Sequence, residues 1–162
     1  MRVIDKYNKK KDIEILWEED VVLIDDKVYV VTDFWKNLKL CMHYEYRLFC
    51  LNDGKINDDL TIIEFGKTLS SSICFEKIEY NMFLGDIIYD IKPTALNGGD
   101  IFLYNDSIFI KTSKEGYFDK FGFYFIDVLD YRTKKIIPLR LEPFAADIKK
   151  YANAYIEVIR NE

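Results

Sequence analysis

The chain contains little of the residues that interrupt regular structure or cross-link a chain. Of its 162 residues, three are proline, seven are glycine, three are cysteine and one is histidine. The scarcity of proline and glycine excludes long linkers and low-complexity disorder. Three cysteines without a C-x-x-C spacing exclude a disulfide framework or a zinc site, and they predict reduced, buried thiols in a cytoplasmic protein.

Long apolar runs and an excess of positive charge are also missing. No apolar stretch approaches the roughly 18 residues of a membrane-spanning helix, and the charged start of the chain is not followed by the apolar segment of a secretory signal. The net charge of −5 disfavours a general nucleic-acid binder. We therefore expect a soluble, acidic, cytoplasmic protein without membrane contact. The local cluster of Lys9, Lys10 and Lys11 is compatible with nucleic acid, but a solvated N-terminal segment is the favoured interpretation.

What the chain has is an internal repeat. The segment Asp20–Asp33 reads DVVLIDDKVYVVTD, and Asp100–Ser113 reads DIFLYNDSIFIKTS, 80 residues later and without a gap. Asp20, Leu23, Asp26 and Thr32 recur as identical residues, and most other positions exchange one β-branched or aromatic residue for another. Self-similarity of this kind predicts two copies of one small module.

The repeat extends beyond this hairpin. Leu16 aligns with Leu96, Tyr44 with Tyr124, and Lys55-Ile56 with Lys135-Ile136, all at the same spacing. We predict a first β-barrel module with a polar N-terminal segment over residues 1–72. The second module, over residues 73–162, carries a C-terminal helix.

Strand-forming residues dominate both copies. Twelve tyrosines and twelve phenylalanines suit pleated, half-buried strands. Asp25-Asp26 and Asn105-Asp106 predict tight hairpin turns, because Asn and Asp tolerate a positive φ. Short strands with tight turns favour a mainly β fold of two tandem SH3-like barrels, with OB-like barrels as the alternative.

The last segment changes its period. Apolar residues recur at spacings of three and four, which predicts an amphipathic α-helix packed on the barrels. These residues are Phe144, Ile148, Tyr151, Ala152, Tyr155 and Ile159.

The phrase Leu96–Ser113, LNGGDIFLYNDSIFIKTS, resembles a module of small, mostly uncharacterised proteins of tailed bacteriophages. In that pattern a leucine, two residues and Gly-Asp precede a hairpin that ends in an apolar-Tyr-Ile-Lys-Thr strand. The first copy departs from the pattern at Glu19, where the glycine is missing. The resemblance implies a fold and a phage origin in the cytoplasm of a bacterial host, but no activity.

Aromatic pairs follow the second strand of each copy. Phe34-Trp35 and Tyr117-Phe118 are predicted to lie in loops, where SH3-like barrels place the groove that binds basic or proline-rich segments. The alternative is that these four side chains close the barrel ends or the contact between the copies.

Residues for catalysis, metals or cofactors form no motif in this chain. His43 lacks a nucleophile and an orienting acid in any motif. Asp25-Asp26 is explained by the hairpin turn, and Asn57-Asp58-Asp59 reads as a solvated loop. Asn97-Gly98-Gly99 lacks the lysine and helix of a phosphate-binding loop. We predict no catalytic residue, no metal and no cofactor.

Three functions remain after these exclusions. The first is a non-enzymatic, phage-encoded protein that binds a host protein through Phe34, Trp35, Tyr117 and Phe118, in host takeover through transcription or as an anti-defence factor. The second is a nucleic-acid-associated small-barrel protein, with stacking by Trp35 or Tyr117 and contacts from Lys9, Lys10 and Lys11. The third, held lowest, is a metal-dependent nuclease.

Overall fold

The computed structural model describes residues 1–5, 13–38, 41–142 and 148–159. The described chain is mainly β, and its only helical element is a short 3-10 helix, η1 (Pro93–Ala95). The strands are β1 (Arg2–Asp5), β2 (Val21–Ile24), β3 (Lys27–Leu38), β4 (Met42–Cys50), β5 (Ile56–Asn57), β6 (Thr61–Phe65), β7 (Thr68–Ser71), β8 (Glu76–Phe83), β9 (Ile87–Ile88), β10 (Ile101–Tyr104), β11 (Ser107–Lys111), β12 (Tyr117–Phe118), β13 (Tyr124–Asp130), β14 (Lys135–Leu141), β15 (Lys149–Tyr151) and β16 (Tyr155–Ile159).

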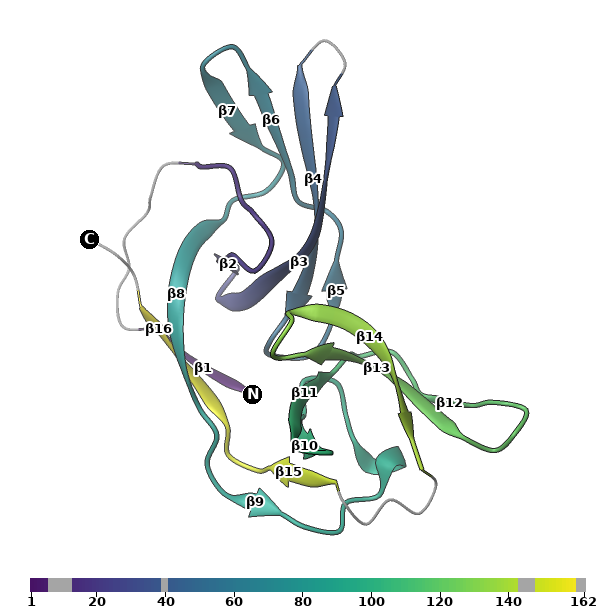
Figure 1. Ribbon diagram of the computed structural model, residues 1–162. Helices are drawn as coiled ribbons and strands as arrows, with labels where there is room; N and C mark the ends of the chain where they lie inside the picture. The colour runs from purple at the N-terminus through teal and green to yellow at the C-terminus, as the bar shows by residue number, and fades with distance from the viewer. Residues whose placement is uncertain (6–12, 39–40, 143–147, 160–162) are drawn as a thin grey trace.

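These strands form two sheets. The first has the order β1-β16-β8-β2-β3-β4-β6-β7, with β5 beside β4. The second has the order β12-β13-β11-β10-β15-β9, with β14 beside β13. Every pairing is antiparallel except that of β1 with β16. Figure 1 shows the upper strands of the first sheet rising as one arm, while β12 and the turn after it project to the side as a second arm.

The two copies fold with the same register. Val21 pairs with Val30 in β2–β3, and Ile101 pairs with Ile110 in β10–β11, each residue 80 positions from its counterpart. The next pairings, β3 with β4 and β11 with β13, keep that spacing, and so do β4 with β5 and β13 with β14. Leu23 and Leu103 therefore occupy equivalent strands. The predicted turns are confirmed too, because Asp25-Asp26 and Asn105-Asp106 have positive φ angles of 47°, 63°, 49° and 61°.

The repeated aspartate has the same task in both copies. Asp20 Oδ2 accepts a hydrogen bond from the Trp17 backbone N–H at 2.8 Å, and Asp100 Oδ2 accepts one from Asn97 at 2.8 Å. Each carboxylate also faces a lysine on the strand that pairs with the hairpin, at 3.6 Å for Asp20 and 3.2 Å for Asp100. The aspartate thus fixes the turn before the hairpin and holds the neighbouring strand.

Strand alternation distributes the apolar residues over three clusters. The outer cluster of the first copy includes Leu16, Val22 and Leu48, and that of the second includes their counterparts Leu96, Phe102 and Val128. The central cluster is formed by the opposite faces of both copies together with residues of β8 and β16. Its buried residues are Val21, Leu23, Val28, Val30, Phe49, Leu51, Ile78, Ile101, Ile110, Leu129, Ala154, Ile156 and Val158. The copies therefore share one core.

One side of the junction between the copies is made of backbone. The turn Asn52-Asp53-Gly54 of the first copy lies on the Gly98-Gly99 segment of the second, and the Ser113 N–H donates to the Gly54 carbonyl at 2.9 Å. A Cβ on Gly98 or Gly99 would stand 2.5 Å from a carbonyl oxygen of that turn. Only glycine leaves room for this contact.

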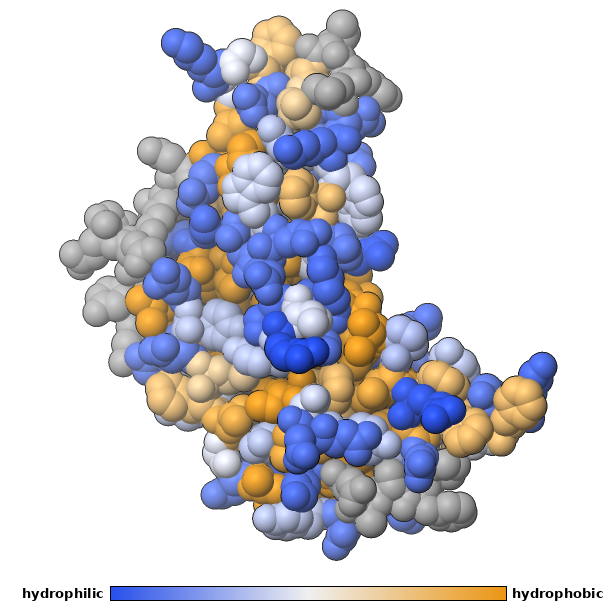
Figure 2. Space-filling view, in the orientation of Figure 1, coloured by the Kyte–Doolittle hydropathy of each residue, from blue (hydrophilic) through white to orange (hydrophobic). Residues whose placement is uncertain are grey.

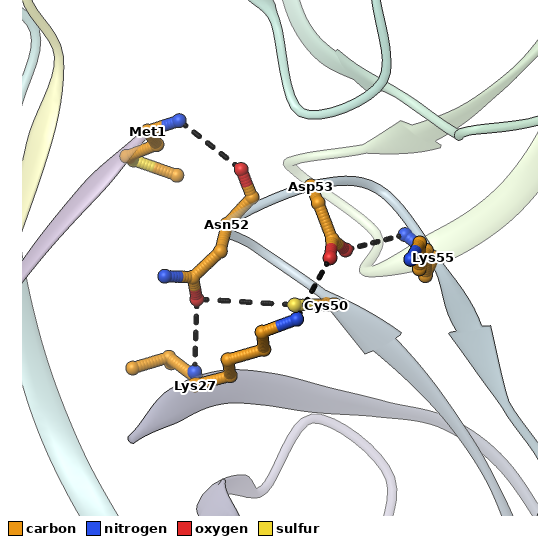
Figure 3. A network of polar contacts seen from close by, with 7 residues as sticks. Met1, Lys27, Cys50, Asn52, Asp53 and Lys55 are labelled. Carbon is orange, nitrogen blue, oxygen red and sulfur yellow. Dashed lines mark hydrogen bonds and ion pairs between the residues drawn. The ribbon is translucent and has the colours of Figure 1, made fainter. Parts of the chain in front are cut away.

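Polar contacts hold the same turn in place. The Asn52 side chain accepts from the Val28 N–H at 3.0 Å, and its carbonyl accepts from the Met1 amino group at 3.2 Å (Figure 3). Asp53 pairs with Lys27 at 3.2 Å and accepts from the Lys55 N–H at 2.9 Å. The turn is thus rigid where the second copy rests on it.

The other side of the junction uses charges. Lys135, the counterpart of Lys55, donates to the Thr32 carbonyl at 2.6 Å and pairs with Glu18 at 3.0 Å and Asp33 at 3.6 Å. Glu18, Thr32 and Asp33 are the counterparts of Gly98, Thr112 and Ser113, in that order. The closing turn of each copy therefore contacts the opening segment of the other, as in the isologous interface of a two-fold dimer.

The predicted C-terminal helix is wrong. Residues 148–159 form β15 and β16, with a turn between them, while Phe144 lies outside the described residues. Ile156 and Val158, which alternate with the predicted stripe, are the buried residues of β16. β16 pairs with the edge of β8 and β15 with the edge of β10. This tertiary pairing overrides the helical spacing of the apolar residues.

The division into modules at residues 72 and 73 stays a prediction. β8 lies after that boundary and pairs with β2 of the first copy, as β15 pairs with β10 of the second. Together β8–β16 and β9–β15 make a ribbon that runs along both sheets (Figure 1).

Ile148 tests the packing of the C-terminal segment, because its side chain is fully buried in the outer cluster of the second copy. We expect Ile148→Asp to lower the free energy of unfolding by about 3 kcal/mol or more, since it places a charge in an apolar contact. The control is Ile88→Asp on exposed β9, expected to cost under about 1 kcal/mol. Urea denaturation measures both, and equal losses would contradict the packing.

Candidate binding surface

Trp35 and Tyr117 occupy equivalent positions in the two sheets. Trp35 stands opposite Glu45, and Tyr117 stands opposite Phe125, the residue 80 positions after Glu45. The sequence places Tyr117 two residues later than the repeat spacing requires. The structure therefore brings these two predicted binding residues to matching sites on the two arms.

The two copies reach this position by different routes. β3 continues through a bulge between Val31 and Asp33, where the buried Thr32 hydroxyl donates to the Arg47 carbonyl at 3.2 Å. In the second copy β11 ends at Lys111. The buried ammonium group of Lys111 donates to the Thr112 and Lys114 carbonyls at 3.1 and 2.8 Å, and burial lowers its pKa. Lys111 thus fixes the segment between β11 and β12.

The first aromatic face comprises Asp33, Trp35, Glu45 and Arg47, which are paired across β3 and β4. The Arg47 guanidinium lies 5.6 Å from the Trp35 ring centroid and donates to Asp58 at 3.0 Å, and this hydrogen bond raises the Arg47 pKa. Arg47 is thereby held beside the indole. The face offers an aromatic surface with carboxylates around it.

The second aromatic face comprises Tyr117, Phe123, Phe125 and Arg140. Tyr117 stacks on Phe125 with ring centroids 5.6 Å apart, and Arg140 lies 4.6 Å from the centroid of the Phe123 ring. Cross-strand pairing places Tyr117, Phe125 and Arg140 in one row. An arginine beside aromatic rings thus recurs, with more apolar surface than on the first face.

Both faces continue from the central cluster. Side chains alternate along a strand, so residues two apart share a face. On β4, Arg47 and Glu45 follow Phe49; on β13, Asp127 and Phe125 follow Leu129. Each face is therefore the outward extension of a surface that the two copies bury against each other.

The aromatic side chains at these positions are exposed. Trp35 exposes 48% of its surface, Tyr117 50% and Phe118 60%, and Phe121 in the turn after β12 exposes 74%. In Figure 2 the arm at the lower right carries pale orange aromatic side chains beside blue charged ones, and it projects from the body. The turn with Phe121 was not predicted, although its Phe-Gly-Phe sequence after Tyr117-Phe118 indicates an aromatic hairpin.

Phe34 and Phe118 lie on the opposite sides of their strands from Trp35 and Tyr117. Phe34 stacks on Tyr46 at 6.0 Å and meets Trp17 edge-on at 5.5 Å, and the Phe118 ring centroid lies 4.8 Å from that of Tyr124. Neither aromatic pair lies in a loop, since Phe34-Trp35 belongs to β3 and Tyr117-Phe118 forms β12. Phe34 therefore supports the arm, while Trp35 faces outward.

The remaining candidates are dispersed. Lys9, Lys10 and Lys11 lie outside the described residues. Across the described ranges, no three His, Cys, Asp or Glu side chains gather as they would around a metal ion. His43 has a neighbour that the sequence prediction missed, because Cys41 Sγ lies 3.2 Å from its Nε2. The spacing C-x-H on a strand is the signal that indicates this pair.

All three cysteines are free, but they are not all buried as predicted. Cys50 is buried, Cys41 is half-buried and Cys74 is exposed. Burial raises the pKa of the Cys50 thiol to about 11.

Comparison of the chain with protein-family models, with curated proteins and with solved structures gives no match. In the part of the chain that the structure describes, no helix is long and apolar enough to cross a membrane.

Tyr46, which supports the first aromatic face from inside, predicts a pH dependence. Burial raises its pKa to about 12, and its hydroxyl bonds with the Leu16 backbone N–H and carbonyl at 3.1 and 3.0 Å. The unfolded chain ionises this tyrosine from about pH 10, whereas the folded chain keeps it neutral. Its contribution to stability is therefore full below about pH 10 and is lost as the pH rises to about 12.

We expect Tyr46→Phe to be less stable than the parent protein by about 1–2 kcal/mol at neutral pH, because two buried backbone groups lose their partner. Between about pH 10 and 12 this gap should shrink and close. Urea denaturation across this pH range measures it, with exposed Tyr89→Phe as the control. A gap that stays constant with pH would contradict the assigned role.

Proposed function

We propose that this protein is a non-enzymatic binding protein that holds a partner protein on its two aromatic faces. The placement of Trp35 and Tyr117 at matching, exposed positions supports the proposal. Large aromatic residues and arginine dominate the binding energy of protein interfaces, and both are present on each face. Cross-strand pairing holds these side chains in rows, which limits the entropy lost when they bind.

Charge favours a protein over nucleic acid as the partner. Asp33, Glu45 and Asp58 lie near Trp35 and Arg47, and two cations pair with them, Arg47 with Asp58 at 3.0 Å and Lys135 with Asp33 at 3.6 Å, so three carboxylates stand against two cations. Carboxylates at this position repel phosphates and attract lysine or arginine side chains. The proposed partner segment therefore combines basic with apolar or aromatic residues.

Within this proposal each copy is an SH3-like barrel, with an OB-like barrel as the alternative. Short antiparallel strands joined by tight turns in the same order support this assignment. The resemblance of Leu96–Ser113 to phage modules supports a phage-encoded protein that acts in the bacterial cytoplasm. Its partner would then be a host protein of transcription or of a defence system.

The second candidate function is binding of single-stranded nucleic acid. The arginines beside Trp35 and Phe123 favour it, because bases stack on aromatic rings while arginine contacts phosphate. Lys9, Lys10 and Lys11 would add cationic contacts in this case. The net charge of −5 opposes it.

Alanine variants of the two faces test the proposed function. In pull-downs from a bacterial lysate, followed by titration of the captured protein, we expect Trp35→Ala and Tyr117→Ala each to weaken binding at least about tenfold. The control is Tyr89→Ala, an exposed tyrosine beyond β9. A loss with Tyr89→Ala equal to those of the face variants, or no loss with any of them, would refute the proposal.

A salt titration separates the two candidate functions. We expect DNA to bind no better than at micromolar Kd in physiological salt, because the net charge opposes the phosphates. The comparison is the variant with Lys9, Lys10 and Lys11 changed to Glu. Nanomolar binding that falls steeply with salt and disappears in this variant would replace the protein-binding proposal with the nucleic-acid one.

A further inference from the structure

A cysteine and the only histidine of the chain meet near the outer end of the first arm. Cys41 immediately precedes β4, and His43 is its second residue, so both side chains lie on one side of the strand. The distance from Cys41 Sγ to His43 Nε2 is 3.2 Å, and both residues are half-buried. One proton is shared between the two atoms, either as S–H···N or as N–H···S. The contact places an imidazole nitrogen within reach of the thiol proton.

The other two cysteines lack this arrangement. Cys50 is fully buried, and its sulfur contacts the Asn52 side-chain oxygen at 3.8 Å. Cys74 is exposed, and no described residue forms a hydrogen bond to its sulfur. Within the described ranges, one thiol thus lies beside a base, one is buried, and one is exposed without a base next to it.

The surroundings of His43 contain few other charges. Asn37 on β3 and Ile63 on β6 stand opposite it, and both are neutral. Glu45 shares its face along β4, whereas Glu64 on β6 points to the other face and accepts from the Tyr44 hydroxyl at 3.2 Å. Among the described residues, Glu45 is the charged group next to the pair on this face, and Arg47 and Asp33 lie further along it.

We propose that Cys41 is a modification site that undergoes thiol–disulfide exchange with small disulfides, with His43 as its base. His43 Nε2 takes the thiol proton, and the Cys41 thiolate attacks one sulfur of the disulfide. A new S–S bond forms to Cys41 as the original S–S bond breaks, and the leaving thiolate takes the proton from His43. The disulfide is the oxidant, so the step leaves one mixed disulfide and one free thiol.

Exchange with oxidised glutathione, followed over time by mass mapping of the Cys41 and Cys74 peptides, tests the proposal. We expect the full-length protein to form the mixed disulfide at Cys41 about tenfold faster than at Cys74 near pH 7. This ratio should decline as the pH rises from about 6 to 9, because hydroxide in solution then competes with His43 as the base. Equal rates at all pH values would overturn the proposal without any substitution.

Two variants assign the role of each residue. His43→Gln should slow the reaction of Cys41 about tenfold and make the Cys41-to-Cys74 ratio independent of pH, while the Cys74 rate stays unchanged and reports an intact fold. Cys41→Ser should remove the fast phase and leave the slow one. An unchanged Cys41 rate in His43→Gln, or a fast phase that survives in Cys41→Ser, would refute the assignment.

Discussion

Each turn that closes one copy of the module rests on the segment that opens the other, and the rest of the fold depends on this exchange. On one side the contact is backbone against backbone and requires Gly98 and Gly99. On the other side it is Lys135 against carboxylates and a carbonyl. A fused chain, unlike a dimer of identical subunits, can make the two halves of an isologous interface chemically different. This freedom explains why Glu19 stands where the second copy has Gly99, since both have a positive φ, of 72° and 84°.

The shared core also determines where the aromatic faces lie. Phe49 and Leu129 anchor β4 and β13 in the central cluster, and the alternation of each strand carries that face outward to Trp35 and Tyr117. The orientation of the two faces is therefore a consequence of the junction. Binding of a partner that contacts both faces would therefore depend on how one copy packs on the other, as well as on the side chains of the faces.

The repeat, the hairpins and their turns could be predicted from the sequence, because strand register and positive-φ turns depend on local residues such as Asp25-Asp26 and Asn105-Asp106. The C-terminal strands could not, because Ile156 and Val158 are buried by pairing with β8, some 75 residues away in the chain. The other apolar residues of this segment recur at three and four, which suits a helix equally well. The loop assignment of Trp35 and Tyr117 failed for a similar reason. β3 is longer than its repeat suggests, and the excursion after β11 depends on the buried Lys111. The exposure of Trp35 and Tyr117 depends on the residues that lie beside them on neighbouring strands. The local sequence around each aromatic residue does not show which residues these are.

The reciprocal junction is tested most directly by two alanine substitutions at glycines with the same backbone conformation. Gly99 and Gly122 both have a φ of +84°, but a Cβ would stand 2.5 Å from the Asn52 oxygen at Gly99 and would meet nothing within 4 Å at Gly122. Both variants carry the strain of a positive φ, so their difference isolates the contact between the copies. Urea denaturation should show Gly99→Ala to be less stable than Gly122→Ala by about 2 kcal/mol or more. Equal losses would show that the copies do not depend on this contact, and they would contradict the account.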